Sequence, residues 1–422
     1  MKIKHILLLV ILASLNLSAQ TGHWEKLNPT ISPSGRFAYG MTSIDSKKVM
    51  LFGGNGYINS FCCASLSDTW LFDLNSKEWT QLFPKISPPK RTNHRMCQIS
   101  EKRVLLFGGD DDQSPYYDDT WIFDLTDTTW TKLEPTNHPN ARSHFGLTRL
   151  NDSLALLFGG RDFNISPHRD TWIFNSNTKE WKQIFFNTSK TPIPYYRIDP
   201  ALVQLEDGKV LLFGGFAESV GGFYLKDTWI FDIKDSLWME IKASGMTDGF
   251  ASSGVCNLNR NKLLVFGGEK GPLTNDSWIF DYQDSIWSII VTDTAPKPTM
   301  YIQLAKIDDG KALLFGGWSD DWPYDDTWIF SIDSLSDVDD ANVYESAFEV
   351  SPNPASDFIE ISVGTRRAVS EQSDVKIFNV YGQTVLSVGA IHELPLRLDI
   401  SGLPPGMYFV RIGDKVGKFV KL

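Results

Sequence analysis

The 422-residue sequence predicts an all-β protein: a six-bladed β-propeller closed by an N-terminal strand, followed by a small C-terminal β-sandwich. Three observations support this fold. A segment of about 50 residues with four strand signals recurs six times. The sixth copy lacks its fourth strand, and a matching strand stands at the other end of the chain, in HWEKL at 23–27. After residue 345, alternating apolar segments separated by Pro, Asn and Gly are typical of a sandwich.

The first residues read as a secretory signal peptide, assigned here to 1–19. They begin with Lys2 and Lys4, continue with an apolar run from Ile6 to Leu15, and end in small residues near Ala19. No later run has the length of a transmembrane helix, and we therefore expect a soluble, exported protein without a membrane span.

The chain is acidic, with a formal net charge of −11. Removal of the signal peptide, with its two lysines, makes the charge about −13. This charge excludes a broad basic face for nucleic acid. Four cysteines in a chain of this length do not form a disulfide framework.

The repeat is defined by a diglycine and by tryptophans. A strand such as RVLLFGG leads to a loop, then to DTWIFD, and then to a Trp nine residues beyond the first. The spacings between diglycines are 55, 51, 55, 53 and 49 residues. We expect the diglycines to adopt positive φ. They are Gly53 and Gly54, Gly108 and Gly109, Gly159 and Gly160, Gly214 and Gly215, Gly267 and Gly268, and Gly316 and Gly317.

Each copy predicts four antiparallel strands. An apolar strand comes first, a polar hairpin turn such as EDGK follows, and the diglycine strand, apolar on both faces, comes next. The two outer strands carry the tryptophans, whose rings we expect to wedge between stacked blades. These are Trp70, Trp121, Trp172, Trp229, Trp278 and Trp328 in the third strand, and Trp79, Trp130, Trp181, Trp238, Trp287 and the N-terminal Trp24 in the fourth.

The diglycine, the paired tryptophans and the strand order resemble the kelch repeat. The resemblance covers about residues 22–333, and we place the kelch propeller at 20–333. Nine residues after Trp328 stands Asp337 instead of Trp, so the sequence predicts that the strand around Trp24 and Leu27 completes the last blade.

An acidic linker at 334–345 precedes a segment that is similar to the type IX secretion (Por secretion) C-terminal sorting domain, placed at 346–422. Its matching parts are Pro352-Asn353-Pro354, Tyr381-Gly382, the block LDISGLPPGMYFVRI, and a basic end with Lys418 and Lys421. This resemblance implies contact with the type IX machinery, export, and release or attachment at the cell surface. An ordinary accessory sandwich is the alternative.

Four arginines occupy one repeat position, 17 residues before the first glycine: Arg36, Arg91, Arg142 and Arg197. One interpretation is a cationic ring at the channel mouth that attracts carboxylates. The other is that each arginine anchors neighbouring carbonyls or the Asp of its own repeat, as the kelch resemblance implies.

Two tryptophans fall outside the repeat positions. Trp318 and Trp322 share one loop with Tyr324, beside several carboxylates. They are candidates for stacking against a sugar, or else they pack the loop. His94 and His144 are further candidate ligand contacts, and a metal or acid–base site near them lacks any supporting ligand spacing.

Several residues leave alternatives open. Asp110, Asp111 and Asp112 suit either Ca²⁺ or a solvated loop. Cys62 and Cys63 can form a vicinal disulfide, whereas Cys97 and Cys256 fall on opposite blades and are expected to be unbonded core residues.

We therefore expect a secreted or cell-surface binding scaffold for a glycan or protein ligand, monomeric, without a metal, a cofactor or catalytic residues. Its working face carries the ring of arginines and the loops at 54–67, 109–118, 160–169, 215–226, 268–275 and 317–325. The alternative is a carbohydrate-active enzyme resembling the kelch sialic-acid epimerases or galactose oxidase. Only His94, His144 and Asp199 are then candidate acid–base groups, and the residues of a copper site are not evident.

Overall fold

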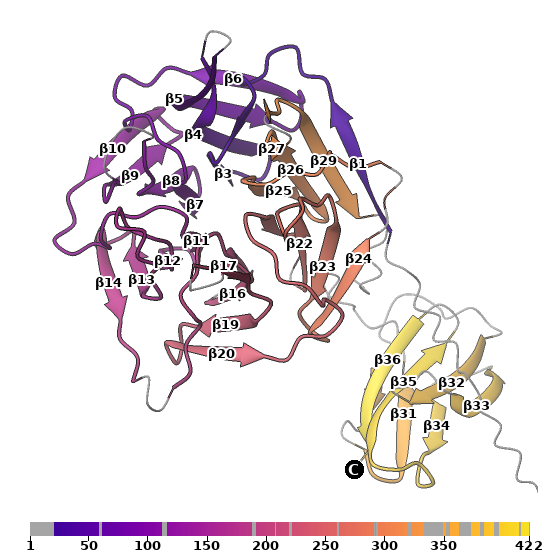
Figure 1. Ribbon diagram of the computed structural model, residues 1–422. Coiled ribbons are helices and arrows are strands. Elements are labelled where there is room, and N and C mark those ends of the chain that lie inside the picture. The colour runs from indigo at the N-terminus through magenta and orange to yellow at the C-terminus, as the bar shows by residue number, and fades with distance from the viewer. Residues whose placement is uncertain are drawn as a thin grey trace, which may run out of the picture. The chain divides into compact units, whose positions relative to one another are not determined.

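The computed structural model describes residues 21–58, 61–111, 116–187, 191–206, 208–218, 222–259, 261–290, 292, 294–319, 322–332, 349–351, 355–362, 373–379, 384–391, 396–412 and 415–421. The predicted signal peptide and acidic linker lie outside these ranges. The chain divides into two compact units, 1–334 and 335–422. All regular elements in the described residues are β-strands, which confirms the all-β class (Figure 1).

In the described part of the first unit, the repeat strands form six antiparallel sheets arranged around a centre (Figure 1). Their strands, from the innermost outward, are β3 (Gly40–Ser43), β4 (Lys48–Ile58), β5 (Phe61–Asp73) and β6 (Glu78–Leu82); β7 (Arg95–Ser100), β8 (Arg103–Phe107), β9 (Thr120–Asp124) and β10 (Thr129–Leu133); β11 (Gly146–Arg149), β12 (Leu154–Phe158), β13 (Thr171–Asn175) and β14 (Glu180–Ile184); β15 (Ala201–Glu206), β16 (Lys209–Phe213), β19 (Thr228–Asp232) and β20 (Leu237–Ile241); β21 (Gly254–Asn257), β22 (Lys262–Phe266), β23 (Ser277–Asp281) and β24 (Ile286–Ile290); and β25 (Leu304–Asp308), β26 (Lys311–Phe315), β29 (Thr327–Ile332) and β1 (Gly22–Leu27).

Short strands extend three of the loops or strand entries. They are β2 (Arg36–Phe37), which pairs with β4; β17 (Phe216–Ala217) with β18 (Phe223–Tyr224); and β27 (Trp318–Ser319) with β28 (Trp322–Pro323). Because the strands alternate in direction, the diglycine loops emerge on one side of the sheets, and the hairpin turns between the first and second strands emerge on the other. We call these sides the loop face and the hairpin face.

The cores lie between the sheets rather than within them. Each sheet shares one apolar cluster with the sheet that follows it in the chain. A further cluster joins Leu313 and Phe315 of the last repeat to Val49 and Leu51 of the first. The diglycine strands are buried on both faces for this reason, as their continuous apolar sequence predicts.

Strand β1 pairs antiparallel with β29, in a register that sets Trp24 opposite Phe330 and Leu27 opposite Thr327. Figure 1 shows the N-terminal strand alongside β29 although the two lie at opposite ends of the unit's sequence. Trp24 is buried, and its indole donates to Ser277 Oγ of the fifth sheet at 3.0 Å.

The Asp-Thr-Trp triplet connects each repeat to its neighbour. The Thr hydroxyl accepts a hydrogen bond from the outermost tryptophan of the next sheet, as Thr69 does from Trp130 (3.2 Å) and Thr120 from Trp181 (3.0 Å). Trp79 of the first sheet donates in the same way to Thr327 of β29 (3.0 Å). In the described residues, the contact is present at five of the six seams; at the sixth, Trp287 Nε1 and Thr228 Oγ1 make no hydrogen bond.

The Asp of the triplet binds the repeat's arginine. In the third repeat, Asp170 accepts two hydrogen bonds from Arg142 (2.6 and 2.9 Å) and one from the indole of Trp172 (2.6 Å). Arg142 also donates to the carbonyl of Gly159 (3.1 Å). Arg36, Arg91 and Arg197 repeat this arrangement with Asp68, Asp119 and Asp227.

The diglycines adopt the predicted positive φ, for example 60° at Gly53 and 95° at Gly54. A Cβ at Gly53 would lie 2.9 Å from the carbonyl oxygen of Arg91, and a Cβ at Gly54 would lie 2.8 Å from that of Phe37. Both the backbone conformation and the available space therefore require glycine here.

The described strands of the second unit form two sheets that share one apolar cluster, which includes Ile359, Ile377 and Phe419. One sheet contains β30 (Glu349–Ser351), β31 (Phe358–Ser362) and β34 (Leu396–Asp399); the other contains β33 (Thr384–Ile391), β32 (Ser373–Asn379), β35 (Gly406–Ile412) and β36 (Lys415–Lys421). Two sheets over one core constitute the small β-sandwich expected from the alternating sequence.

Replacing Arg142 with Met should destabilise the first unit strongly. The substitution leaves the largely buried Asp170 carboxylate without its cation, which typically costs roughly 3–5 kcal/mol. Arg103→Met, which breaks the more exposed pair with Asp124, should change stability by no more than about 1 kcal/mol. Urea unfolding followed by tryptophan fluorescence measures both, and equal effects of the two substitutions would contradict the anchoring role.

The stability difference between the native protein and Arg142→Met should narrow in acid. Burial alone would raise the pKa of Asp170, but the hydrogen bonds and charge of Arg142 outweigh burial and hold the pKa below its ordinary value of 3.8. The pair therefore stabilises the folded state above that value, and this contribution is lost as the pH falls through the lowered pKa. Urea midpoints of both proteins at pH 7, 4 and 3 measure the narrowing.

Candidate functional site

The four arginines belong to the repeat framework. Their side chains are fully buried or nearly so, and each is paired within its own repeat. Each Nε also donates to a carbonyl two residues earlier, as Arg91 does to Pro89 at 3.0 Å. These contacts favour the anchoring interpretation over a cationic ring at the channel mouth.

A circle of backbone hydrogen bonds surrounds the centre of the first unit. It joins six residues, one per repeat, each 15 residues before the first glycine of its diglycine: Ala38, Asn93, His144, Asp199, Ser252 and Tyr301. Each N–H donates to the carbonyl of the preceding member, at 2.7–3.3 Å. The N–H of Ala38 donates to Tyr301, which completes the circle (2.8 Å). We call these six residues the collar.

All six collar residues adopt left-handed backbone conformations, with φ between 46° and 60°. For residues other than glycine this conformation costs roughly 1–2 kcal/mol each. None of the six is glycine, although the diglycines show that the repeat uses glycine where φ is positive. Backbone geometry is thus the same in all six repeats while the side chain differs in every one.

A second ring lies beside the collar. Each member is two residues after the first glycine and pairs with the residue just before a collar position, as Asp110 does with Thr92 and Glu269 with Ala251. The members are Asn55, Asp110, Arg161, Phe216, Glu269 and Trp318. Their side chains also differ from repeat to repeat. The collar and the second ring together form what we call the axial site.

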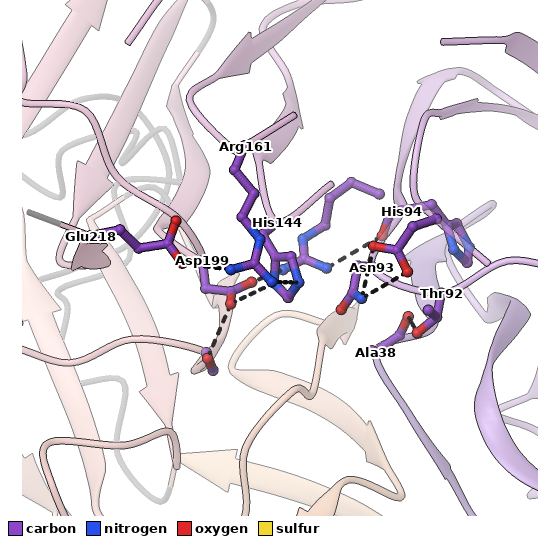
Figure 2. A network of polar contacts seen from close by, with 11 residues as sticks. Ala38, Thr92, Asn93, His94, His144, Arg161, Asp199 and Glu218 are labelled. Atoms are coloured by element: carbon purple, nitrogen blue, oxygen red, sulfur yellow. Dashed lines mark hydrogen bonds and ion pairs between the residues drawn. The ribbon is translucent and has the colours of Figure 1, made fainter. Parts of the chain in front are cut away.

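His144 and Asp199 form the centre of the polar network shown in Figure 2. His144 Nδ1 lies 2.8 Å from Asp199 Oδ2, and both side chains are buried. His144 Nε2 lies 3.5 Å from Nη2 of Arg161, which can only donate. This contact assigns the ring hydrogen to Nδ1 and makes Nε2 the acceptor.

Asp199 receives further donors from two other sheets. Arg95 Nη2 lies 3.2 Å from Oδ1, and the Ser252 hydroxyl lies 3.3 Å from Oδ2. Burial would raise the pKa of Asp199, but its contacts with His144 and Arg95 outweigh burial and lower it. Asp199 therefore remains a carboxylate at neutral pH and orients the imidazole.

Acidic and phenolic groups cluster on the adjoining repeats. Glu269 hydrogen-bonds to Tyr224, and both act electrostatically on Tyr301 of the collar. Burial, with a smaller effect from Asp199, raises the pKa of Glu269. Burial and the nearby carboxylates also raise the pKa of Tyr301, so its phenol stays protonated. The Tyr301 and His144 rings lie 6.2 Å apart.

His94 does not join this network as a ligand-facing group. It is one residue beyond the collar position of its repeat, fully buried, with its ring 5.6 Å from that of Phe52. Burial and the nearby Arg91 and Arg95 lower its pKa well below the ordinary value. His94 is thus a neutral core residue between the first two sheets.

The loop aromatics take different positions. Trp318 is half-buried against Phe37 (4.8 Å), and Tyr324 is half-buried with Lys297 Nζ 5.2 Å from its ring. Trp322 is 57% exposed and stacks on Tyr57 of the first repeat. Phe163 and Phe223 are also exposed on the loop face. We call Phe163, Phe223 and Trp322 the aromatic rim.

A cavity of about 1020 Å³ occupies the centre of the first unit. The six innermost strands β3, β7, β11, β15, β21 and β25 line it, and it extends to the hairpin face at Asp45, Glu101 and Asp152. Arg95 also lines the cavity and reaches from the second repeat to Asp199 of the fourth. The axial site therefore stands between the cavity and the loop face.

The other residues that the sequence singled out, the aspartates at 110–112 and the cysteines, do not form a second site in the described residues. In the described ranges, no group of three or more His, Cys, Asp or Glu side chains could hold a metal ion. Asp110 and Asp111 are buried, and Asp112 lies outside the described residues. Cys63 is disulfide-bonded, but the Cys62 side chain is not described. Cys97 and Cys256 are buried and unbonded, as predicted.

The sequence contained a signal for the collar. Counting back 15 residues from each diglycine gives its six members, yet their identities differ so completely that no repeated motif marks them. The sequence marks His144 and Asp199 as candidate acid–base groups, but it does not mark Asn93, Ser252, Tyr301, Arg161 or Glu269.

Comparison with known proteins agrees with these features. The family model of the KLHDC2/KLHL20/DRC7 Kelch-repeats domain matches residues 10–160, 64–249 and 152–338. The family model of the secretion system C-terminal sorting domain matches residues 349–422. In the part of the chain that is described, there is no helix whose length and apolar character suit a membrane crossing.

Curated relatives share the repeat region. An F-box/kelch-repeat protein of Arabidopsis thaliana is 29% identical over 53% of this chain and 48% of its own length. Adagio protein 3 of the same plant is 25% identical over 61% of this chain and 42% of its own. The flagellar outer-arm dynein alpha chain of Chlamydomonas reinhardtii is 25% identical over 71% of this chain and 7% of its own.

The chain thus corresponds to about half or less of each of these relatives, and the shared part is the repeat array. The repeat model spans well over half of the chain, and the sorting-domain model spans its end. The chain therefore belongs to the kelch-repeat family and ends in a secretion-system C-terminal sorting domain.

Proposed function

We propose that the first unit is a six-bladed kelch propeller closed by its N-terminal strand. Three sets of contacts support closure: β1 pairs with β29, a core cluster joins the last repeat to the first, and Ala38 hydrogen-bonds to Tyr301. The Trp79–Thr327 contact is a fourth. A closed ring has no free sheet edge at which the chain could aggregate.

The sorting domain indicates export by type IX secretion, and hence a place outside the cell or on its surface. We propose that the chain is cleaved after its signal peptide and that residues 346–422 contact the type IX machinery. The kelch unit is then the part that works outside the cell.

We propose that this unit is a binding scaffold that uses the loop face, with the axial site at its centre. One observation carries this proposal: backbone geometry at the collar is identical in six repeats, while the six side chains are all different. Framework positions such as the diglycines keep one residue type because one structural requirement applies. Divergence at strained, mostly polar, axial positions indicates selection for a ligand instead.

The aromatic rim also supports a binding role for the loop face. Phe163, Phe223 and Trp322 present large apolar surface around the axial site, and exposed aromatics of this kind mark binding surfaces. Both a glycan and a protein are compatible with such a face. His144, Trp318, Trp322 and Tyr324 remain proposed ligand contacts, whereas His94 and the four framework arginines do not.

A carbohydrate-active enzyme is the second candidate, and the His144–Asp199 pair is the observation that favours it. An imidazole oriented by a buried carboxylate is suited to general base catalysis. Its free nitrogen, however, already faces Arg161, which places a guanidinium where a substrate proton would have to lie.

Deleting residues 22–27 should lower the thermal transition of the kelch unit substantially. The deletion exposes β29 and removes the buried Trp24, and loss of a buried tryptophan alone typically costs about 3–5 kcal/mol. Trp322→Ala, which removes an exposed tryptophan, should leave the transition nearly unchanged. Differential scanning calorimetry compares the two, and an unchanged transition after the deletion would refute closure.

Ligand binding should depend on the loop face. On glycan and peptide arrays, any ligand of the native protein should be lost or weakened at least tenfold by Trp322→Ala and by His144→Asn, which keeps a residue that tolerates positive φ. Glu101→Gln, on the hairpin face, should bind normally. A ligand that binds both loop-face variants as tightly as it binds the native protein would contradict the proposal.

Chemical conversion of the bound ligand distinguishes the enzyme from the binding scaffold. Every ligand found on the arrays is incubated with the native protein and with His144→Asn, and the products are analysed by mass spectrometry. The scaffold predicts unchanged ligand with both. Conversion that disappears in the His144 variant would instead establish the enzyme.

A further inference from the structure

The charges at the axial site do not balance. Its members Asp110, Asp199 and Glu269 are carboxylates and Arg161 is a guanidinium, and the Glu218 carboxylate and the Arg95 guanidinium contact them from outside the site. Asp199 pairs with Arg95 at 3.2 Å, and Glu218 pairs with Arg161 at 2.5 Å. Within the described ranges, no salt bridge joins Asp110 or Glu269 to a basic side chain.

Glu269 is a half-buried carboxylate whose hydrogen-bond donor is the neutral phenol of Tyr224. The neighbouring Lys270 is directed elsewhere: its Nζ lies 3.2 Å from Asp276 and 3.7 Å from Asp248. Asp199 adds a repelling negative charge, and this charge together with burial raises the pKa of Glu269. A cation placed beside Glu269 would offset both the cost of burying its carboxylate and the repulsion from Asp199.

Asp110, in the second repeat, is also a carboxylate with a neutral hydrogen-bond donor and no paired lysine among the described residues. Its two carboxylate oxygens lie 3.2 and 3.3 Å from the amide nitrogen of Asn93, a neutral donor. The nearby Lys90 pairs with Asp111 instead, at 3.1 Å. Burial raises the pKa of Asp110, although His144, hydrogen bonds from Ser143 and Asn93, and the charge of Arg161 oppose this effect. Two carboxylates of the axial site thus lack a cation of their own.

Aromatic groups complete the surroundings. Tyr301 and Tyr224 stand beside Glu269, and Phe216, Trp318 and Arg161 are further half-buried members of the second ring. Carboxylates together with aromatic rings are the groups that bind ammonium and guanidinium ions in proteins.

We propose that the axial site binds the ammonium or guanidinium group of a lysine or arginine side chain of a protein partner. This inference rests on the proposed scaffold function and specifies its ligand. The overall charge of −11 favours approach of a basic partner. The exposed Phe163, Phe223 and Trp322 come from three different repeats, a spread that suits the footprint of a protein.

The test uses the full mature chain and an array of short peptides, each containing one Lys or Arg. Each peptide is paired with a copy in which acetyl-lysine or citrulline replaces the charged residue. Lys- or Arg-containing peptides should bind, and their neutral copies should bind roughly 10- to 100-fold more weakly. Binding should also weaken as salt concentration rises.

Variants locate the site. Glu269→Gln, which preserves shape and removes the charge, should weaken binding of the charged peptides roughly 10- to 100-fold, and Asp110→Asn should weaken it as well. Glu101→Gln removes the same charge on the hairpin face and should bind like the native protein. Calorimetry of each variant confirms that it is folded, and Asp110→Asn keeps the test decisive should Glu269→Gln not fold.

Three results would overturn the inference: no basic peptide binds, neutral copies bind equally well, or Glu269→Gln and Asp110→Asn both bind normally. A fourth such result would come from an array of chitosan oligosaccharides, which carry amines on a sugar. If the protein prefers these oligosaccharides to the peptides, a protein partner is excluded. If the ligand found is neutral or acidic yet requires Trp322, the scaffold function stands and this inference fails. If no ligand requires the loop face, both fail.

Discussion

The circle of six backbone hydrogen bonds at the collar is the constraint on which the rest of the first unit depends. Each bond requires a left-handed residue at the entry to an innermost strand, and each links one sheet to the next. The arginine two residues earlier fixes that entry in four repeats, because it holds the chain to the diglycine carbonyl and to the Asp of the triplet. Framework and axial site are therefore physically continuous: the anchor sets the backbone, and the backbone presents the collar side chain.

This continuity explains why the two classes of position differ in their sequence. The triplets and outer tryptophans make the same contacts in most repeats, and a substitution in them would alter the packing of two sheets. The collar and second ring satisfy their backbone bonds whatever the side chain is, apart from the cost of positive φ. The side chains at the axis are consequently free to differ. The repeats use this freedom to build a network with one oriented histidine and two carboxylates without a paired cation.

Most of the fold was predictable from the sequence because repeated contacts leave repeated residues. The four strands per repeat, the positive φ of the diglycines and the unbonded Cys97 and Cys256 follow from patterns that occur in several copies. The axial site was predictable only in part. Arg36 and its equivalents repeat because they are anchors, so a conspicuous pattern pointed away from the site. His94 and His144 looked alike, but a shift of one residue directs one ring into a core and the other into the network, and no single copy reveals that register.

The position of β1 has a consequence for the order of folding. Trp24 pairs opposite Phe330, about 300 residues away, and closing a loop of that length costs roughly 5 kcal/mol of chain entropy. The five intervening sheets reduce this cost, because each cluster between neighbouring sheets brings the next strand entry closer to the axis. Pairing of β1 with β29 is therefore favourable only after the other sheets have formed. The collar follows the same order, since the bond from Ala38 to Tyr301 joins its first and last members. A polar network that spans several repeats, as that of His144 does, is thus assembled only when most of the sheets are in place. We therefore expect the proposed ligand binding to depend on the N-terminal strand, although that strand contributes no residue to the axial site.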